Sequence, residues 1–361
     1  MKKLNINDNT KIYVLLHTSL PSGGTELLHQ LVFHLRESLF LNAHLYYPFD
    51  GEAIHPFYQK YKNTFVNTIE DNKSNILIYP EAAWIINIVN KYENIRKCMW
   101  WLSVDNFYLS YIFGSRKRFF FQRAINKLFK LWGREPIFDL VDLAYQKYFI
   151  NNGFKPNQFL KDFILKADFH LAQSYYAINH LKNIGIPHEK IFYLSDYLNE
   201  NFLNIKTDLT KKENIVAYNP KKGLSFTTKI IKYASEIKFV PIINMTRQEV
   251  IKTLQKAKVY IDFGNHPGKD RLPREAAILG CCVITGKRGS AKYFKDVPIP
   301  EEYKFEDKEK NIPLIVEKIK DCFKNFEMHY KNFENYRKII KNEPEKFIKD
   351  LKSIFEVKRI I

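Results

Sequence analysis

Cysteine is scarce in this sequence of 361 residues, and no long apolar run interrupts it. The four cysteines, Cys98, Cys281, Cys282 and Cys322, have no spacing typical of a metal site, so we expect reduced core residues and a cytoplasmic protein. No run approaches the ~18 apolar residues that cross a bilayer, and no signal peptide precedes the first expected strand. Internal repeats are absent too. These absences argue against a disulfide framework, a membrane-spanning helix and a repeat architecture.

Acidic residues are outnumbered, with 39 Asp and Glu against 57 Lys and Arg and a net charge of +18. This excess predicts an anionic partner, either a phosphorylated ligand, a nucleic acid or a membrane surface. The lysines are scattered and no nucleic-acid-binding motif is present, so we expect no nucleic-acid partner. The length suggests two soluble globular domains.

The stretch from Val259 to Ser290 organises the rest of the chain. Val259 to Phe263 predicts a strand, a loop follows, a helix is expected to start at Pro273, and Cys281 to Thr285 predicts a second strand. Glycine, cations at a helix N-terminus and a carboxylate one turn further suit a phosphorylated ligand with a ribose. These residues are Gly268, Lys269, Arg271, Arg274 and Glu275.

The segment from Glu275 through Gly280 to Thr285 resembles the nucleotide-sugar site of GT-B glycosyltransferases of the Glu-x7-Glu type. Pro267 stands where that pattern has its first Glu, which leaves the donor sugar and the stereochemical outcome open. The resemblance implies that Glu275 holds the ribose of a nucleotide diphosphate-sugar. It also implies that Lys269 and Arg271 neutralise the diphosphate, so that the enzyme needs no metal and no cofactor.

Two shorter matches accompany this site. Asn219-Pro220-Lys221-Lys222-Gly223 follows an expected strand and resembles the Lys-Gly turn that holds the donor diphosphate. Gly23 and Gly24 follow an expected strand from Lys11 to His17 and resemble the Gly-Gly-x-Glu loop of many GT-B enzymes. Lys221, Lys222, Gly23 and Gly24 therefore join the candidate donor-binding residues.

Further apolar runs predict strands at 42–47, 75–79, 97–104, 166–172 and 191–194. We expect an α/β protein with two Rossmann-like doubly wound domains facing a cleft. We predict an N-terminal domain at 1–195, a linker at 196–213 and a C-terminal donor domain at 214–361 that ends in helices. Ligands of such sheets lie beyond the carboxyl ends of the strands. His17, Glu81 and Asp105 occupy such ends and are the candidate catalytic residues, although each also suits a structural role.

The region from Asn106 to Arg134 has seven basic residues and no acidic one. On a helix, Phe121, Ile125, Leu128, Phe129 and Trp132 share one face, and Arg123, Lys127, Lys130 and Arg134 share the other. Such a helix at 116–134 either binds an anionic membrane surface or packs on its own domain with a solvated basic face.

We therefore expect a glycosyltransferase that moves a sugar from a nucleotide diphosphate-sugar to a surface-glycan or lipid-linked saccharide acceptor, as in capsule or lipopolysaccharide synthesis. The location would be cytoplasmic, peripheral on the inner face of the membrane. One alternative keeps the fold but transfers another nucleotide-activated group. Another is a non-catalytic nucleotide-binding subunit of a glycan assembly complex.

Overall fold

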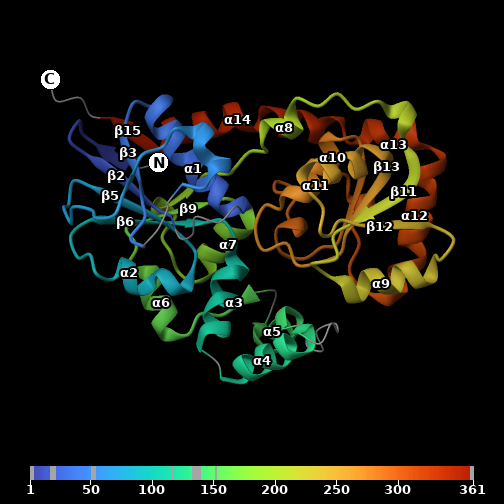
Figure 1. Cartoon of the computed structure of the whole chain (residues 1–361), viewed down its shortest axis with the longest axis horizontal. Coiled ribbons are helices and arrows are strands. Elements are labelled where there is room, and N and C mark those ends of the chain that lie inside the picture. The colour runs from blue at the N-terminus through green and yellow to red at the C-terminus, as the bar shows by residue number, and fades with distance from the viewer. Residues whose placement is uncertain are drawn as a thin grey trace. The chain divides into compact units, whose positions relative to one another are not determined.

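The computed structural model describes residues 4–16, 22–49, 54–115, 117–131, 140–150 and 153–357 (Figure 1). The chain forms two compact units, residues 1–194 with 348–361, and residues 195–347. The segment 196–213, expected as a linker, is part of the second unit. The candidate His17 lies outside the described residues.

The first unit is built on a seven-stranded sheet in which every neighbouring pair is parallel. Its strand order is β10 (Ile191–Tyr193), β9 (Phe169–Ala172), β6 (Arg96–Trp101), β5 (Ile76–Pro80), β2 (Lys11–Leu15), β3 (Asn42–Tyr46) and β4 (Phe65–Val66). Central strands such as β5 are buried along their whole length, which explains their continuous apolar sequences. The strands predicted in this half all form, with ends shifted by one to three residues.

Helices join these strands. They are α1 (Gly23–Glu37), α2 (Ile86–Val89), α3 (Val104–Ser115), α4 (Lys117–Leu131), α5 (Leu140–Tyr148), α6 (Gln158–Leu165) and α7 (Tyr175–Asn183), with 3-10 turns η1 (Pro56–Tyr61), η2 (Ala83–Ile85) and η3 (His188–Lys190). A short antiparallel pair, β7 (Phe149–Ile150) and β8 (Gly153–Phe154), follows α5. The apolar side chains of α1 lie on one buried face.

The second unit has a parallel four-stranded sheet in the order β12 (Lys238–Pro241), β11 (Glu213–Tyr218), β13 (Ala257–Asp262) and β14 (Cys282–Thr285). Its helices are α8 (Glu200–Leu203), α9 (Leu224–Tyr233), α10 (Arg247–Lys256), α11 (Arg271–Ile278), α12 (Ile312–Lys324), α13 (Phe326–Asn332) and the start of α14 (Glu334–Ile354), with turns η4 (Leu209–Lys211), η5 (Gly289–Lys292), η6 (Glu301–Tyr303) and η7 (Glu309–Asn311). Thr246 and Glu249 form a capping box at the start of α10.

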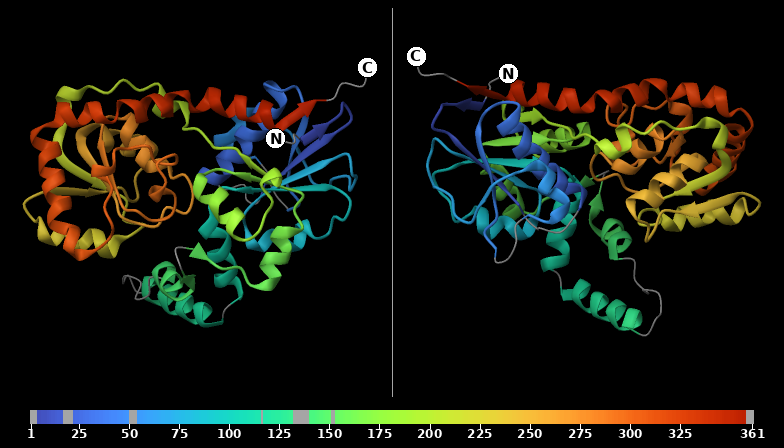
Figure 2. Two further views of the ribbon diagram at one scale, coloured as in Figure 1. Left: turned by 180° about the vertical axis from the view of Figure 1, so that it is seen from behind. Right: turned by 45° about the horizontal axis from the view of Figure 1, so that its top comes forward.

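The two ends of the chain pair with each other in the first unit (Figure 2). β1 (Leu4–Ile6) runs parallel to β15 (Phe355–Val357). Residues 348–361 therefore belong to the first unit, although the sequence placed all of 214–361 in the second domain. In the described part of the chain, no helix combines the length and apolarity that crossing a membrane requires.

Candidate functional site

Two loops of the second unit touch at the carboxyl ends of the adjacent strands β11 and β13. Gly223 has φ 57°, and a Cβ there would lie 1.4 Å from the carbonyl oxygen of Phe263. A Cβ on Gly264 would lie 2.5 Å from the Cβ of Lys222. Only glycine allows this approach of one backbone to the other. The predicted Lys-Gly turn and the predicted donor loop are thus one packed structure.

A third loop, after β14, also packs against the loop 264–270, which we call the donor loop. A Cβ on Gly289 would lie 2.0 Å from the carbonyl oxygen of His266. The amide of Ser290 donates to that oxygen at 2.8 Å, and its hydroxyl donates to the carbonyl of Gly268 at 2.6 Å. These contacts fix the turn at 286–290 to the loop 264–270.

Two helices begin at this edge, α9 after Gly223 and α11 after Asp270. Neither N-cap residue makes a side-chain hydrogen bond to the amides of its helix. Uncapped helix N-termini supply amide donors and a partial positive charge for an anion. α11 begins at Arg271, two residues before the predicted Pro273, because proline is tolerated throughout a first helical turn, where amides have no intrahelical acceptor. Glu275 lies one turn into α11 and is half-buried.

The predicted cations fall into two groups. Lys221 is exposed, Lys222 is half-buried and paired with Asp270, and Arg271 is half-buried with Nε 3.9 Å from Asp196. Lys269 is buried instead, and its Nζ donates to Glu343 at 2.7 Å and to Ser195 at 3.0 Å.

Arg274 is fully buried between the same two carboxylates. It donates to Glu343 at 2.8 Å and to Asp196 at 2.7 Å. Burial works against the charge, but these carboxylates hold the pKa of Arg274 above its usual range. Arg274 and Lys269 therefore join α11 to α14 and to the segment after β10. No local pattern indicates Asp196 and Glu343, which lie 78 and 69 residues away from Arg274.

A further group in the donor loop comprises Asp262, His266 and Asp270, with one ligand atom from each within 4.8 Å of the others. These are donor types that hold divalent cations. The sequence analysis missed this group, although the i, i+4 spacing of the three residues was a usable signal.

The candidates in the first unit are occupied by internal contacts. Glu81 is buried and accepts the amide of Leu102 at 2.9 Å; burial raises the pKa of Glu81 to about 7. Asp105, buried in the first turn of α3, accepts the hydroxyls of Tyr145 at 2.7 Å and Tyr176 at 2.6 Å. Both carboxylates join separate segments of the fold.

Gly23 and Gly24 begin helix α1, so they do not form the expected turn. The side chain of Ser22 caps this helix by accepting the amide of Thr25. A Cβ on Gly24 would meet its nearest neighbour, in Leu102, at 4.0 Å. Among the described residues, no close backbone approach therefore requires glycine at Gly24.

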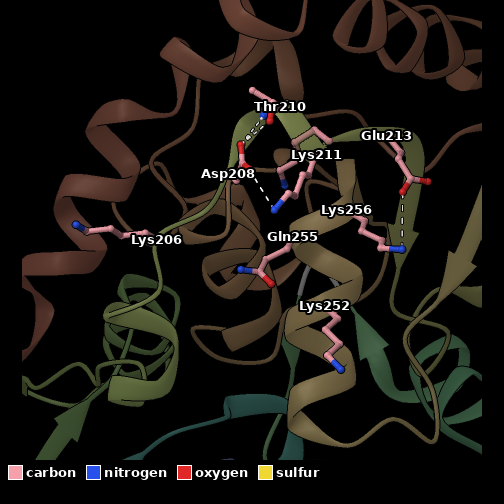
Figure 3. Close-up of a pocket in the computed structure, with 9 residues that line it drawn as sticks. Lys206, Asp208, Thr210, Lys211, Glu213, Lys252, Gln255 and Lys256 are labelled. Atoms are coloured by element: carbon pink, nitrogen blue, oxygen red, sulfur yellow. Dashed lines mark hydrogen bonds and ion pairs between the residues drawn. The ribbon is translucent and has the colours of Figure 1, made fainter.

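A separate cavity of about 610 Å³ lies near the start of β11 and the end of α10 (Figure 3). Five lysines and two carboxylates line it, including ion pairs of Lys211 with Asp208 at 3.4 Å and of Lys256 with Glu213 at 3.8 Å. The C-terminus of α10 directs carbonyl oxygens to this region, which disfavours an anion. The cavity therefore has lysine side chains but faces the C-terminus of α10, not the N-terminus of a helix.

Comparison with known proteins identifies the fold. No protein-family profile and no curated protein matches the sequence. Among solved structures, the lipopolysaccharide outer core galactosyltransferase WaaB has a TM-score of 0.57 at 10% identity, over 95% of this chain and 99% of its own. Anabaena HepE in complex with UDP-glucose has a TM-score of 0.55 at 12% identity, over 95% and 99%. Sucrose-phosphate synthase from Thermosynechococcus elongatus has a TM-score of 0.57 at 11% identity, over 96% and 98%. The chain has the GT-B fold that the sequence predicted.

Proposed function

We propose that this protein is a glycosyltransferase that moves a sugar from a nucleotide diphosphate-sugar to a saccharide acceptor without a metal ion. One observation carries the proposal. At one edge of a parallel sheet, two loops make a close contact that only glycine allows. Around this contact lie two uncapped helix N-termini and three cations, Lys221, Lys222 and Arg271. This combination suits a diphosphate, because amide dipoles and fixed cations both stabilise its charge.

In this proposal Glu275 accepts hydrogen bonds from the ribose hydroxyls, and Lys221, Lys222 and Arg271 neutralise the diphosphate leaving group. Lys269 was predicted for the same task. Its pairing with Glu343 assigns it instead to fixing the start of α11. We do not propose Glu81 or Asp105 as the catalytic base, since internal hydrogen bonds occupy both carboxylates.

The structural neighbours support the choice of donor and acceptor classes. HepE is described with UDP-glucose, and WaaB is described as a galactosyltransferase of the lipopolysaccharide outer core. UDP is therefore the first nucleotide to test, and a surface-glycan or lipid-linked saccharide is the proposed acceptor. Pro267, in place of a first Glu, favours one alternative, the transfer of another nucleotide-activated group.

A thermal-shift screen against UDP, GDP, CDP and dTDP tests the donor assignment. A ligand at ~100 times its Kd adds about 2.7 kcal/mol to the free energy of unfolding. Glu275→Ala is expected to abolish the shift, whereas Glu309→Ala, which removes an exposed partner of Lys229 in the same unit, keeps it. Release of the nucleotide from its sugar conjugate then measures transfer.

The screen separates the alternatives. Absence of a shift with every nucleotide would contradict the site itself. A shift without turnover of any nucleotide-sugar would favour the non-catalytic subunit.

We also propose that α4 binds an anionic membrane surface, at the inner face of the cytoplasmic membrane. Figure 1 shows α4 and α5 beyond α3, away from the sheet of the first unit. Within α4, Phe121 is 65% exposed, Leu128 50% and Ile125 37%. The helix is anchored by the buried Phe119 near its start, and its central apolar side chains are left in solvent. An exposed apolar face beside cations is typical of an interfacial helix.

Liposome co-sedimentation tests this proposal. Reversal of the exposed Arg123 and Lys127 to Glu should weaken binding to phosphatidylserine vesicles by at least ~2 kcal/mol, about 30-fold, since each cation near such a surface contributes ~1 kcal/mol. Reversal of Lys161 and Lys182, exposed elsewhere in the first unit, is the charge-matched control. An equal loss of vesicle binding in both double variants would mean that the net charge of the protein determines binding, and the assignment to α4 would be wrong.

A further inference from the structure

His266 in the donor loop lies between two carboxylates. Its Nδ1 is 2.9 Å from Asp270 Oδ2, and its Nε2 is 3.6 Å from Asp262 Oδ1. The ring is fully buried. A carboxylate beside each ring nitrogen favours the doubly protonated imidazolium, which has a donor on both sides.

The contacts of His266 lead on to Lys222, a proposed contact of the diphosphate. Asp270, the N-cap residue of α11, also accepts from the ammonium group of Lys222, in the turn before α9. Asp262 ends β13 and accepts the hydroxyl of Tyr260 at 2.8 Å. These contacts thus join the end of β13 to the N-termini of α9 and α11 at the proposed nucleotide site. They run from Asp262 through His266 and Asp270 to Lys222.

The charges in this series alternate in sign. Two carboxylates face one imidazolium and one ammonium group. One more acidic group, Asp307, lies near His266 and Asp262, and Arg288 neutralises it at 3.1 Å. Burial opposes the charge of the ring, but Asp262 and Asp270 hold the pKa of His266 above its ordinary value. The pKa of Asp270 is lowered by Lys222 and His266 despite its burial.

A metal ion is the competing interpretation of Asp262, His266 and Asp270. One cation is coordinated by one nitrogen of an imidazole ring, yet the two carboxylates here approach opposite nitrogens. The ammonium group of Lys222 already occupies Asp270. A protonated imidazole therefore fits these positions better than a metal ion does.

We propose that His266 is a positioning residue of the nucleotide site, which as an imidazolium fixes Asp270 and, through it, holds Lys222 beside the diphosphate. This inference rests on the proposed function. In this proposal His266 also keeps the loop in place beside Pro267, which stands where the Glu-x7-Glu pattern has its first Glu. Loss of His266 would leave the buried Asp262 and the half-buried Asp270 as two neighbouring negative groups, and Lys222 would lose its fixed partner.

The charge state can be measured without any nucleotide. NMR titration of 15N-labelled histidines, with the His266 signal assigned by its loss in His266→Gln, should show this imidazole protonated above the ordinary pKa of histidine. A neutral ring at pH 6.5 would overturn the proposal. So would a stoichiometric divalent metal in the purified protein that His266→Gln removes. Because no ligand is added, this result stands even if nucleotide binding fails.

A double-mutant cycle then tests the positioning. His266→Gln and Asp270→Asn should each raise the KM for the nucleotide-sugar about 10-fold and change kcat less than about threefold. The double variant should be no worse than either single variant, because both changes release the same lysine. Additive losses, or a fall in kcat with an unchanged KM, would overturn it.

His329 provides a matched control in the same unit. It is also buried beside a carboxylate, with Nε2 2.9 Å from Asp321, but it lies on α13, outside the three loops of the site. His329→Gln should lower the melting temperature and leave the KM unchanged. An equal rise in KM would show that His266 acts through general stability alone. Absence of nucleotide binding by the wild type would contradict the proposed function, not the imidazolium.

Discussion

The carboxyl ends of the two parallel sheets use polar residues in different ways. In the first unit, Glu81 and Asp105 are buried, and their oxygens accept hydrogen bonds from an amide and from two tyrosine hydroxyls. In the second unit, Lys221 is exposed and Lys222 is half-buried beside closely packed glycine loops. A polar residue at the end of a strand is therefore not enough to identify a site. Its exposure and its internal partners determine whether a ligand can reach it.

The helix N-termini at the two edges differ in the same sense. The side chain of Ser22 caps α1, whereas α9 and α11 lack such a cap. A side-chain cap satisfies amides that would otherwise bind water or an anion. The side chain of Ser22 therefore closes the start of α1, whereas α9 and α11 keep amide donors for a ligand.

The largest difference between the carboxyl edges of the two sheets is expected in stability, when one glycine at each edge is replaced by alanine. Gly223→Ala should lower the free energy of unfolding by about 4 kcal/mol, from a clash with the Phe263 carbonyl and a positive φ. Gly24→Ala in α1 should raise it by up to ~1 kcal/mol, because alanine favours a helix. Urea unfolding measures both. Similar values for the two variants would remove the contrast between the edges.

The next effect concerns the buried carboxyl of Glu81, whose pKa is raised to about 7. Between its ordinary value of 4.5 and about 7, the folded state keeps a proton that the unfolded state releases. The free energy of unfolding should therefore fall by on the order of 3 kcal/mol as the pH rises through this range. Glu81→Gln should flatten the profile. Parallel wild-type and variant profiles would show that Glu81 ionises normally and that burial does not raise its pKa.

Much of the fold could be predicted because its signals are local. Apolar runs bounded by glycine and proline located β13 and β14. The β1 and β15 pair could not be found, since each strand has three residues and its partner is at the other end of the chain.

The site was predicted less completely, for the same reason. The loop, its glycines and Lys222 follow from short motifs. The inward direction of Lys269 depends on Glu343, 74 residues away, and no local pattern contains that information. No cationic motif contains Asp262, His266 and Asp270, although the carboxylate of Asp270 fixes one of the predicted cations, Lys222, in place.

The smallest expected effect compares two exposed lysines of the second unit, Lys221 at the carboxyl edge and Lys252 at the cavity of Figure 3. Lys221→Ala should weaken nucleotide diphosphate binding by up to ~1 kcal/mol, about fivefold, and lessen its dependence on salt, because an exposed ion pair is weak and screened. Lys252→Ala carries the same charge change beside the C-terminus of α10 and should leave affinity unchanged. Calorimetric titration at two salt concentrations distinguishes them. An equal loss in both variants would mean that the net charge of the unit, and not the carboxyl edge, attracts the nucleotide.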